Sequence, residues 1–249
     1  MLTLLRQEAY KAFKGKAIYI SLILLLIYQG LIAFGTKQYH IISPNEFITT
    51  AGNAEQIVEI IMVVIASTII TNEFVNKTIK NLLCRQYSRL QVFLSKFITL
   101  VWMYVLIVVV NYLFTLIFKV LLFRSTQVTS QMIHATANNG IGQTLYVFLI
   151  TAFVILISNI AKSSGGAIGI GVATILASQV LATVLSLLIN KMNLVKFNPF
   201  NFFLVSSQYG SDAVKSVTHL SLNAMTIGAL IYGVIFYAIA YMIFNHRNI

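Results

Sequence analysis

Apolar stretches long enough to cross a lipid bilayer alternate with short polar segments along the 249-residue chain. A transmembrane helix needs about 20 consecutive, mostly apolar residues, and six stretches of the chain meet this condition. The predicted spans cover residues 17–34, 54–71, 89–123, 141–160, 166–189 and 224–244. The sequence therefore predicts an all-α integral membrane protein in which residues 1–249 form a single transmembrane domain.

The segment before the first span, residues 1–16, has the pattern of a helix that lies in the membrane interface. Its apolar face would be formed by Leu2, Leu5, Ala9, Ala12 and Phe13, and its polar face by Arg6, Gln7, Tyr10 and Lys14. A signal peptide is the competing interpretation, because a basic start precedes an apolar run. That run is longer than the ~7–15 residues of a signal-peptide core, so a first transmembrane helix is favoured.

A short helix is also expected in the connection between the first two spans. Residues 43–46, Ser-Pro-Asn-Glu, combine a capping residue, a proline at the first helical position and an acid in the first turn. The pattern leaves open whether the chain kinks or breaks at Gly52, just before the second span.

A basic island, residues 72–96, lies between the second and third spans. Its apolar positions fall on one helical face, at Val75, Ile79, Leu82 and Leu83. Polar residues, among them Lys77 and Arg85, cover the rest, and Ser88 with Gln91 has the pattern of a capping box that starts the next helix. The positive-inside rule alone explains the charge, but it does not explain an apolar stripe that needs a covering surface.

The island resembles the segment after the second span of ABC-2-type exporter permeases. The matching residues, in order and spacing, are Glu73, Thr78, Leu82, Leu83, Ser88, Arg89 and Lys96. The family's Gly before the Thr is Lys77 here, and its Pro ahead of the Ser-Arg pair is absent. Within the family, the chain is similar to the branch that exports amphipathic peptides, namely the bacteriocin-immunity permeases and the phenol-soluble modulin exporter.

The resemblance implies that the island forms a coupling helix that docks in a cleft of a cytosolic ATP-binding subunit. The expected contact residues are Glu73, Val75, Lys77, Thr78, Ile79, Leu82, Leu83, Arg85 and Arg89, with Lys162 of the turn between spans four and five as a second contact. ATP and magnesium would be bound by that partner, and this chain would bind no cofactor. A second permease chain, expected to be identical, would complete the transport path.

Two features are candidates for the substrate path. Glu59 lies more than one turn inside the second span, where an ionised group is expected to face a partner or a water-filled cavity. The aromatic connection between the last two spans corresponds, by resemblance, to short re-entrant helices that close the outer end, with Phe197, Phe200 and Phe203 as gate residues. A belt of aromatic residues at the membrane interface explains the same composition.

Gly165 and Gly169 form a GxxxG pattern at the start of the fifth span. Small residues at this spacing let helix backbones approach closely, so packing within the helix bundle is the expected role. A hinge is the alternative.

Composition excludes several classes of function. The chain is 58% hydrophobic and 9% charged, against about 25% charged in soluble domains. The net charge of +11 includes no long basic run, so no nucleic-acid partner is expected. P-loop, H-E-x-x-H, CxxC and G-x-S-x-G motifs are absent, so neither a catalytic site nor a metal site is predicted. The span centres carry almost no ionisable residues, so energy for transport is expected from a separate subunit.

The basic residues predict the orientation in the membrane. With six spans and an inner N-terminus, the inner segments carry Arg6, Lys11, Lys14, Lys16, Lys77, Lys80, Arg85, Arg89, Lys96, Lys162 and Arg247. The outer segments carry Lys37, Lys119, Arg124, Lys191, Lys196 and Lys215. The excess favours a plasma-membrane protein with both termini in the cytoplasm.

The function expected from these observations is that of a permease subunit of an ABC exporter. Its cargo would be amphipathic peptides of the toxin or antimicrobial type, moved out of a bacterial cell through a path in contact with membrane lipid. Two alternatives remain open at this point. One is an exporter of a lipid or a small hydrophobic drug, and the other is a non-transporting membrane scaffold or sensor.

Overall fold

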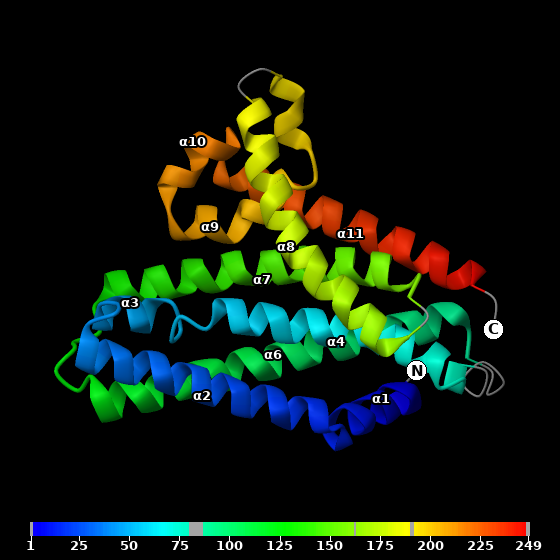
Figure 1. Ribbon diagram of the computed structural model, residues 1–249, viewed down its shortest axis with the longest axis horizontal. Coiled ribbons are helices and arrows are strands. Elements are labelled where there is room, and N and C mark those ends of the chain that lie inside the picture. Colours follow the sequence, from blue (N-terminus) through cyan, green and yellow to red (C-terminus); the bar gives the residue numbers. More distant parts are fainter. Residues whose placement is uncertain (1, 80–86, 162, 190–191, 248–249) are drawn as a thin grey trace. The chain divides into compact units, whose positions relative to one another are not determined.

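The computed structural model describes residues 2–79, 87–161, 163–189 and 192–247, and over these residues every regular element is a helix (Figure 1). Among the described helices, six are long and apolar enough to cross a membrane, which confirms the predicted all-α membrane fold. They are α2 (Lys16–Tyr39), α4 (Glu55–Val75), α6 (Arg89–Leu122), α7 (Ser130–Ser158), α8 (Ser164–Ile189) and α11 (Leu222–His246).

Shorter helices precede and connect these six. α1 (Leu2–Lys14) precedes α2, and α3 (Pro44–Thr49) precedes α4. Between α8 and α11 the chain forms short α- and 3₁₀-helices: η1 (Asn193–Phe197), η2 (Asn201–Leu204), α9 (Val205–Gly210), η3 (Asp212–Val214) and α10 (Lys215–Thr218). The aromatic connection that the sequence singled out is therefore helical.

The helix boundaries differ most from the predicted spans at α7, which begins at Ser130 rather than near residue 141. The additional turns are polar, so the apolar run does not reveal them. Thr129 caps them, because its hydroxyl oxygen accepts a hydrogen bond from the Met132 N–H at 3.3 Å.

Contacts divide the chain into two compact units. The first comprises Met1–Ile61 and Ser95–Asn139, and the second comprises Met62–Leu94 and Gly140–Ile249. The long helices α4, α6 and α7 each contribute one portion to either unit.

In the first unit, α3 begins as predicted. The Ser43 hydroxyl oxygen accepts a hydrogen bond from the Glu46 N–H at 3.0 Å, and Pro44 occupies the first helical position. The buried ring of Phe47 packs on Phe123, with ring centroids 5.3 Å apart. This contact fixes α3 against the end of α6.

The connection from α3 to α4 is a break, because Ala51, Gly52 and Asn53 all have positive φ, of 49°, 76° and 53°. A buried amide pair holds it. Gln29 of α2 donates from Nε2 to Asn111 Oδ1 of α6 at 2.5 Å and to the Ala51 carbonyl at 3.2 Å. A Cβ at Gly52 would lie 2.7 Å from the Gln29 side chain, so only glycine fits there. Amide N–H groups inside a membrane need internal acceptors, and these segments supply them to Gln29 Nε2 and Asn111 Nδ2.

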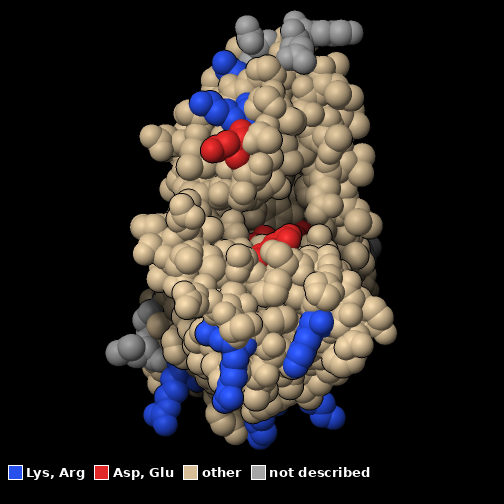
Figure 2. Space-filling view, turned by 90° about the vertical axis from the view of Figure 1, so that its left-hand side faces the viewer, with Lys and Arg blue, Asp and Glu red and all other residues tan. Residues whose placement is uncertain are grey.

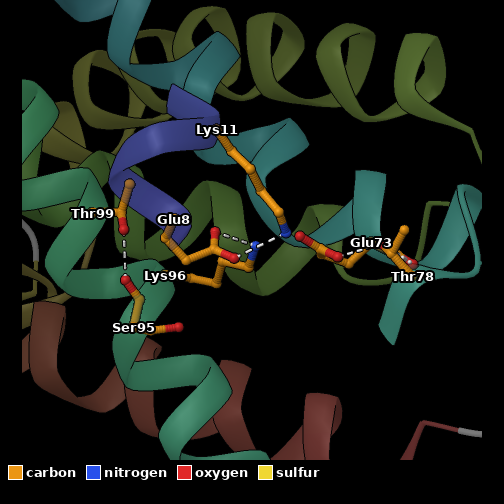
Figure 3. Close-up of polar contacts among 7 residues, drawn as sticks. All are labelled: Glu8, Lys11, Glu73, Thr78, Ser95, Lys96 and Thr99. Carbon is orange, nitrogen blue, oxygen red and sulfur yellow. Dashed lines mark hydrogen bonds and ion pairs between the residues drawn. The ribbon is translucent and has the colours of Figure 1, made fainter. Parts of the chain in front are cut away.

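An ion pair that the sequence did not predict joins α1 to α6. The Glu8 carboxylate lies 2.5 Å from the Lys96 ammonium and 3.1 Å from that of Lys11 (Figure 3). Leu4 and Glu8, at 0% and 4% exposure, form the inward face of α1, whereas Phe13 is exposed. The side of α1 that faces the protein therefore carries Leu4 and the ion pair, and it is not the predicted apolar face, which includes the exposed Phe13.

Candidate functional site

The segment after α4 is a turn and not one continuous helix. α4 ends at Val75, Asn76 and Lys77 form a turn, and helical structure resumes at Thr78 and Ile79. Lys77 has a φ of 54°, the left-handed conformation that residues with a Cβ disfavour, and this interrupts the helix. The prediction of one helical stripe through Val75 and Ile79 is therefore wrong. Lys77 occupies the position where ABC-2-type permeases carry Gly, which adopts this conformation without strain.

The two ends of the predicted stripe face different ways. Val75 is 41% exposed and Lys77 is also exposed, whereas Ile79 is only 2% exposed. The remaining predicted contacts on Leu82, Leu83, Arg85 and Lys162 lie outside the described residues. Of the predicted docking residues in the described part, Val75 and Lys77 are the ones on the surface of this turn.

Glu73 and Thr78 hold the turn from its two sides. The Thr78 hydroxyl donates to the Glu73 carboxylate and lies 3.3 Å from the Glu73 carbonyl oxygen (Figure 3). Glu73 is buried, so its carboxylate depends on such donors. These two residues, predicted to touch a partner, therefore shape the turn that presents Val75 and Lys77.

A second turn, between α7 and α8, is bound to the end of α4. The Ser164 hydroxyl donates to Asn72 Oδ1 at 2.5 Å, and the Thr71 hydroxyl donates to the Ser158 carbonyl at 3.2 Å. The two turns that the sequence predicts separately as partner contacts thus lie side by side. We call residues 71–79, 158–161, 163 and 164 together the turn junction.

Arg247 joins the turn junction to the end of α11. Its guanidinium donates to the carbonyls of Asn159 at 2.5 Å and Ala161 at 3.0 Å, and it lies 4.0 Å from the Phe74 ring centroid. The carbonyls follow the last turn of α7, where a cation is favourable. Desolvation lowers the pKa of Arg247, which nevertheless stays protonated. Nothing in the sequence indicates this role, because a short polar tail does not show which helix it reaches.

Arg89 caps the end of α11 in a similar way. The predicted capping box is confirmed, since the Ser88 N–H donates to Gln91 Oε1 at 3.0 Å and the Gln91 N–H to Ser88 Oγ at 3.2 Å. The first turn of α6 then directs Arg89 to the carbonyls of Asn245 at 2.5 Å and Arg247 at 3.1 Å. Arg89, which was predicted to contact a partner subunit, forms these hydrogen bonds within the chain.

The turn junction therefore links the ends of α4, α7 and α11 and the starts of α6 and α8. The exposed turn at Val75 and Lys77 is thus connected to these helix ends by hydrogen bonds. Over the described ranges, no three His, Cys, Asp or Glu side chains come together as a metal site. The arrangement suits mechanical coupling.

The predicted path residues belong to different units. In the first unit, Glu59 is 7% exposed and so lies in the protein, as an acid at this depth of a span should. In the second, Phe200 and Phe203 pack on Phe153 of α7, with ring centroids 5.9 Å apart in both pairs. Phe197 is half exposed. The aromatic segment is thus anchored on α7, and Phe153 is the partner that the sequence did not reveal.

The glycines that face inward on α8 are not the predicted pair. Gly165 and Gly169 are exposed, and a Cβ built on either would meet no described atom within 4 Å. Ala167 and Gly171 form the buried face, and a Cβ on Gly171 would lie 3.0 Å from Val63 of α4. The small-residue contact exists but is displaced by two residues, which moves it to the opposite side of the helix.

The six long apolar helices define a multi-pass membrane protein. A family model described as "ABC-2 family transporter protein" matches residues 4–180, and the chain belongs to this family. It is similar to "Uncharacterized membrane protein YdbK" of Bacillus subtilis (strain 168), with 28% identity over 190 residues, 73% of this chain and 76% of that protein. It is also similar to "Uncharacterized protein YhcI" of the same strain, with 22% identity over 219 residues, 82% of this chain and 68% of that protein.

Proposed function

We propose that this chain is the membrane-spanning permease subunit of an ABC exporter, driven by a separate cytosolic ATP-binding subunit. The observation that carries the proposal is the turn junction, where an exposed apolar and basic turn at Val75 and Lys77 is tied to the ends of several spanning helices. If the docked ATP-binding subunit, which is the motor of the exporter, moves this turn, it would move those helices together. ATP and magnesium would be bound in the motor subunit.

Two identical chains would enclose the path, each with an ATP-binding subunit below it. Closure of the two motor subunits on ATP would displace the turn junctions and switch access from the inner leaflet to the outside. The excess of basic residues on one side supports an orientation with both termini in the cytoplasm of the cell whose plasma membrane holds the protein.

The proposed cargo is amphipathic peptides of the toxin or antimicrobial type. The support is the resemblance to bacteriocin-immunity permeases and the phenol-soluble modulin exporter. The buried acid Glu59 would pair with a basic group of the cargo, and Phe197, Phe200 and Phe203 would close the outer end. Glu59→Gln should lower peptide export at unchanged membrane abundance; unaltered export would remove Glu59 from the path.

Docking is tested with the double variant Val75→Asp/Lys77→Glu, which alters exposed positions only. Compared with the wild type in the presence of an ATP-binding subunit from the same cell, the variant should lose co-purification and stimulated ATP hydrolysis while still inserting into the membrane. Lys37→Glu, on an exposed residue at the end of α2, is the matched charge control and should behave as the wild type. If the wild-type chain neither binds the motor nor changes its turnover, a scaffold or sensor role replaces the proposal.

The cargo is tested separately, by deleting the chain from its cell. The deletion should sensitise cells to helical amphipathic peptides, or trap such peptides inside them, and leave tolerance of small lipophiles unchanged. The opposite pattern would assign export of a lipid or a small hydrophobic drug to the same machine.

A further inference from the structure

A groove with a volume of about 400 Å³ opens on the first unit, remote in sequence from the turn junction. One wall is a single stripe of α6, formed by Tyr112, Thr115, Leu116 and Lys119, and the other includes Ile133 and Ala137 of α7. The α6 residues recur at i, i+3, i+4 and i+7, so the groove follows the helix axis for about 10 Å. We call it the α6 groove.

The two threonine hydroxyls along the groove form hydrogen bonds within the protein. The Thr115 hydroxyl donates to the Asn111 carbonyl at 3.0 Å, and the Thr136 hydroxyl donates to the Met132 carbonyl at 2.8 Å. With these hydroxyls engaged, the groove offers few bonds to water. An apolar cavity of this kind gains from being filled by hydrocarbon.

Lys119 lies at the end of the α6 stripe, next to the last turn of the helix. It is the charged residue among those that line the groove, and within the described ranges no carboxylate forms an ion pair with it. Arg124 and Lys37 are exposed at the ends of α6 and α2 in the same unit. Figure 2 shows basic side chains gathered on the lower part of the face toward which these helix ends point.

We propose that the α6 groove binds an anionic glycerophospholipid of the surrounding membrane. The lipid phosphate pairs with the Lys119 ammonium, and an acyl chain runs between the α6 stripe and α7. The outward face of α6 beside the groove, with Leu113, Ile117 and Leu121 half or more exposed, meets lipid along the same turns. The groove therefore offers a cation at one end of an apolar slot, which matches the two chemical parts of a lipid and places it where lipid is the solvent.

The test is native mass spectrometry of the purified, detergent-extracted protein with phosphatidylglycerol or phosphatidylcholine added. The wild type should retain phosphatidylglycerol in preference to phosphatidylcholine. Lys119→Gln should lower retained phosphatidylglycerol about fivefold, the effect of roughly one basic residue at an anionic surface, and Lys119→Arg should restore it. Lys37→Gln, outside the groove, should leave retention unchanged.

Ala137→Phe, which fills the slot, should remove retention of both lipids. If Ala137→Phe does not fold, the comparison of Lys119→Gln with the wild type is sufficient to test whether the groove binds the anionic lipid. Equal retention of phosphatidylglycerol by the wild type and Lys119→Gln would overturn the proposal. So would retention of an added amphipathic helical peptide that Ala137→Phe abolishes while lipid stays bound, because the groove would then be a peptide site.

Discussion

Lys77 is the residue that gives the turn junction its shape. A left-handed conformation is disfavoured for residues with a Cβ by about 1–2 kcal/mol, and the surrounding contacts hold Lys77 in it at a φ of 54°. Its neighbours Glu73 and Thr78 close the turn through the buried carboxylate. The family carries Gly at this position, and Gly is typical of a position with positive φ, so the resemblance points to a turn here. The periodicity of apolar residues continues through Lys77 without interruption, so the hydrophobic pattern does not predict the turn.

Substitutions at Lys77 should follow backbone preference and not charge. Lys77→Ala should unfold at the wild-type temperature, because Ala and Lys meet a similar left-handed penalty. Lys77→Val should lower the free energy of unfolding by about 1 kcal/mol, since a β-branched side chain is poorly accommodated there, and Lys77→Gly should equal or exceed the wild type. Thermal unfolding in detergent measures the series. Equal midpoints for the Val and Gly variants would show that the turn is not left-handed.

At the scale of elements, the helix starts that carry a capping box or an N-cap signal were predictable, whereas the start of α7 and the contacts between helices were not. The capping signals at residues 43–46 and at Ser88 depend only on residues adjacent in sequence, so they can be identified from the sequence. Which face of α8 packs inward depends on its partner α4, and Gly171 rather than Gly169 meets it. The reach of Arg247 to the α7 carbonyls and the orientation of α1 likewise depend on neighbours far away in sequence. Periodicity identifies an apolar face only where apolar contacts set the orientation.

The amide pair between α2 and α6 should be energetically coupled. Asn111→Leu removes the partner of the buried Gln29 amide and should lower the free energy of unfolding by about 1 kcal/mol, a typical value for such bonds in membrane proteins. Gln29→Leu should have a similar effect. Because both changes break the same bonds, the double variant should lose less than the sum of the two. Additive losses, measured by thermal unfolding, would show that the amides act independently.

Another cation should not be able to replace the Arg247 guanidinium, which donates to two carbonyls. Lys cannot donate to both the Asn159 and Ala161 carbonyls with the same planar geometry, and it loses the guanidinium contact with Phe74. Arg247→Lys should therefore lower the free energy of unfolding by about 1.5 kcal/mol and weaken the effect of the chain on its motor. Arg6→Lys, on an exposed residue of α1, is the control. Wild-type stability in Arg247→Lys would show that charge alone suffices.

For the whole molecule, the six long helices agree with what the apolar pattern predicts, and membership of the ABC-2 transporter family agrees with the resemblance that residues 72–96 carry. The pattern does not reveal the first turns of α7, because they are largely polar. It does not reveal the α6 groove either, because the groove forms between helices whose lining residues are distant in sequence. The division into two units was also not readable from composition, since three helices contribute to both.

The proposed orientation predicts opposite labelling of two exposed positions. In a chain with Cys84→Ser, Val75→Cys should react with an impermeant thiol reagent only in inverted vesicles. Lys37→Cys, one span after the N-terminus, should react in intact cells. Labelling of both from the same side would contradict the six-span arrangement, and the reverse pattern would place the termini outside.

The Glu8–Lys96 ion pair has a consequence for synthesis of the chain. Its two residues are 88 positions apart, so at about 5–20 residues per second the ribosome delivers the lysine roughly 4–18 s after the glutamate. During that interval Lys11 is the partner that the structure provides for the Glu8 carboxylate, and the exposed Tyr10 and Phe13 can hold α1 on the lipid surface. The ion pair that joins α1 to α6 can form only once the start of α6 has been synthesised. A nascent chain stalled before residue 96 should still carry a loose N-terminus.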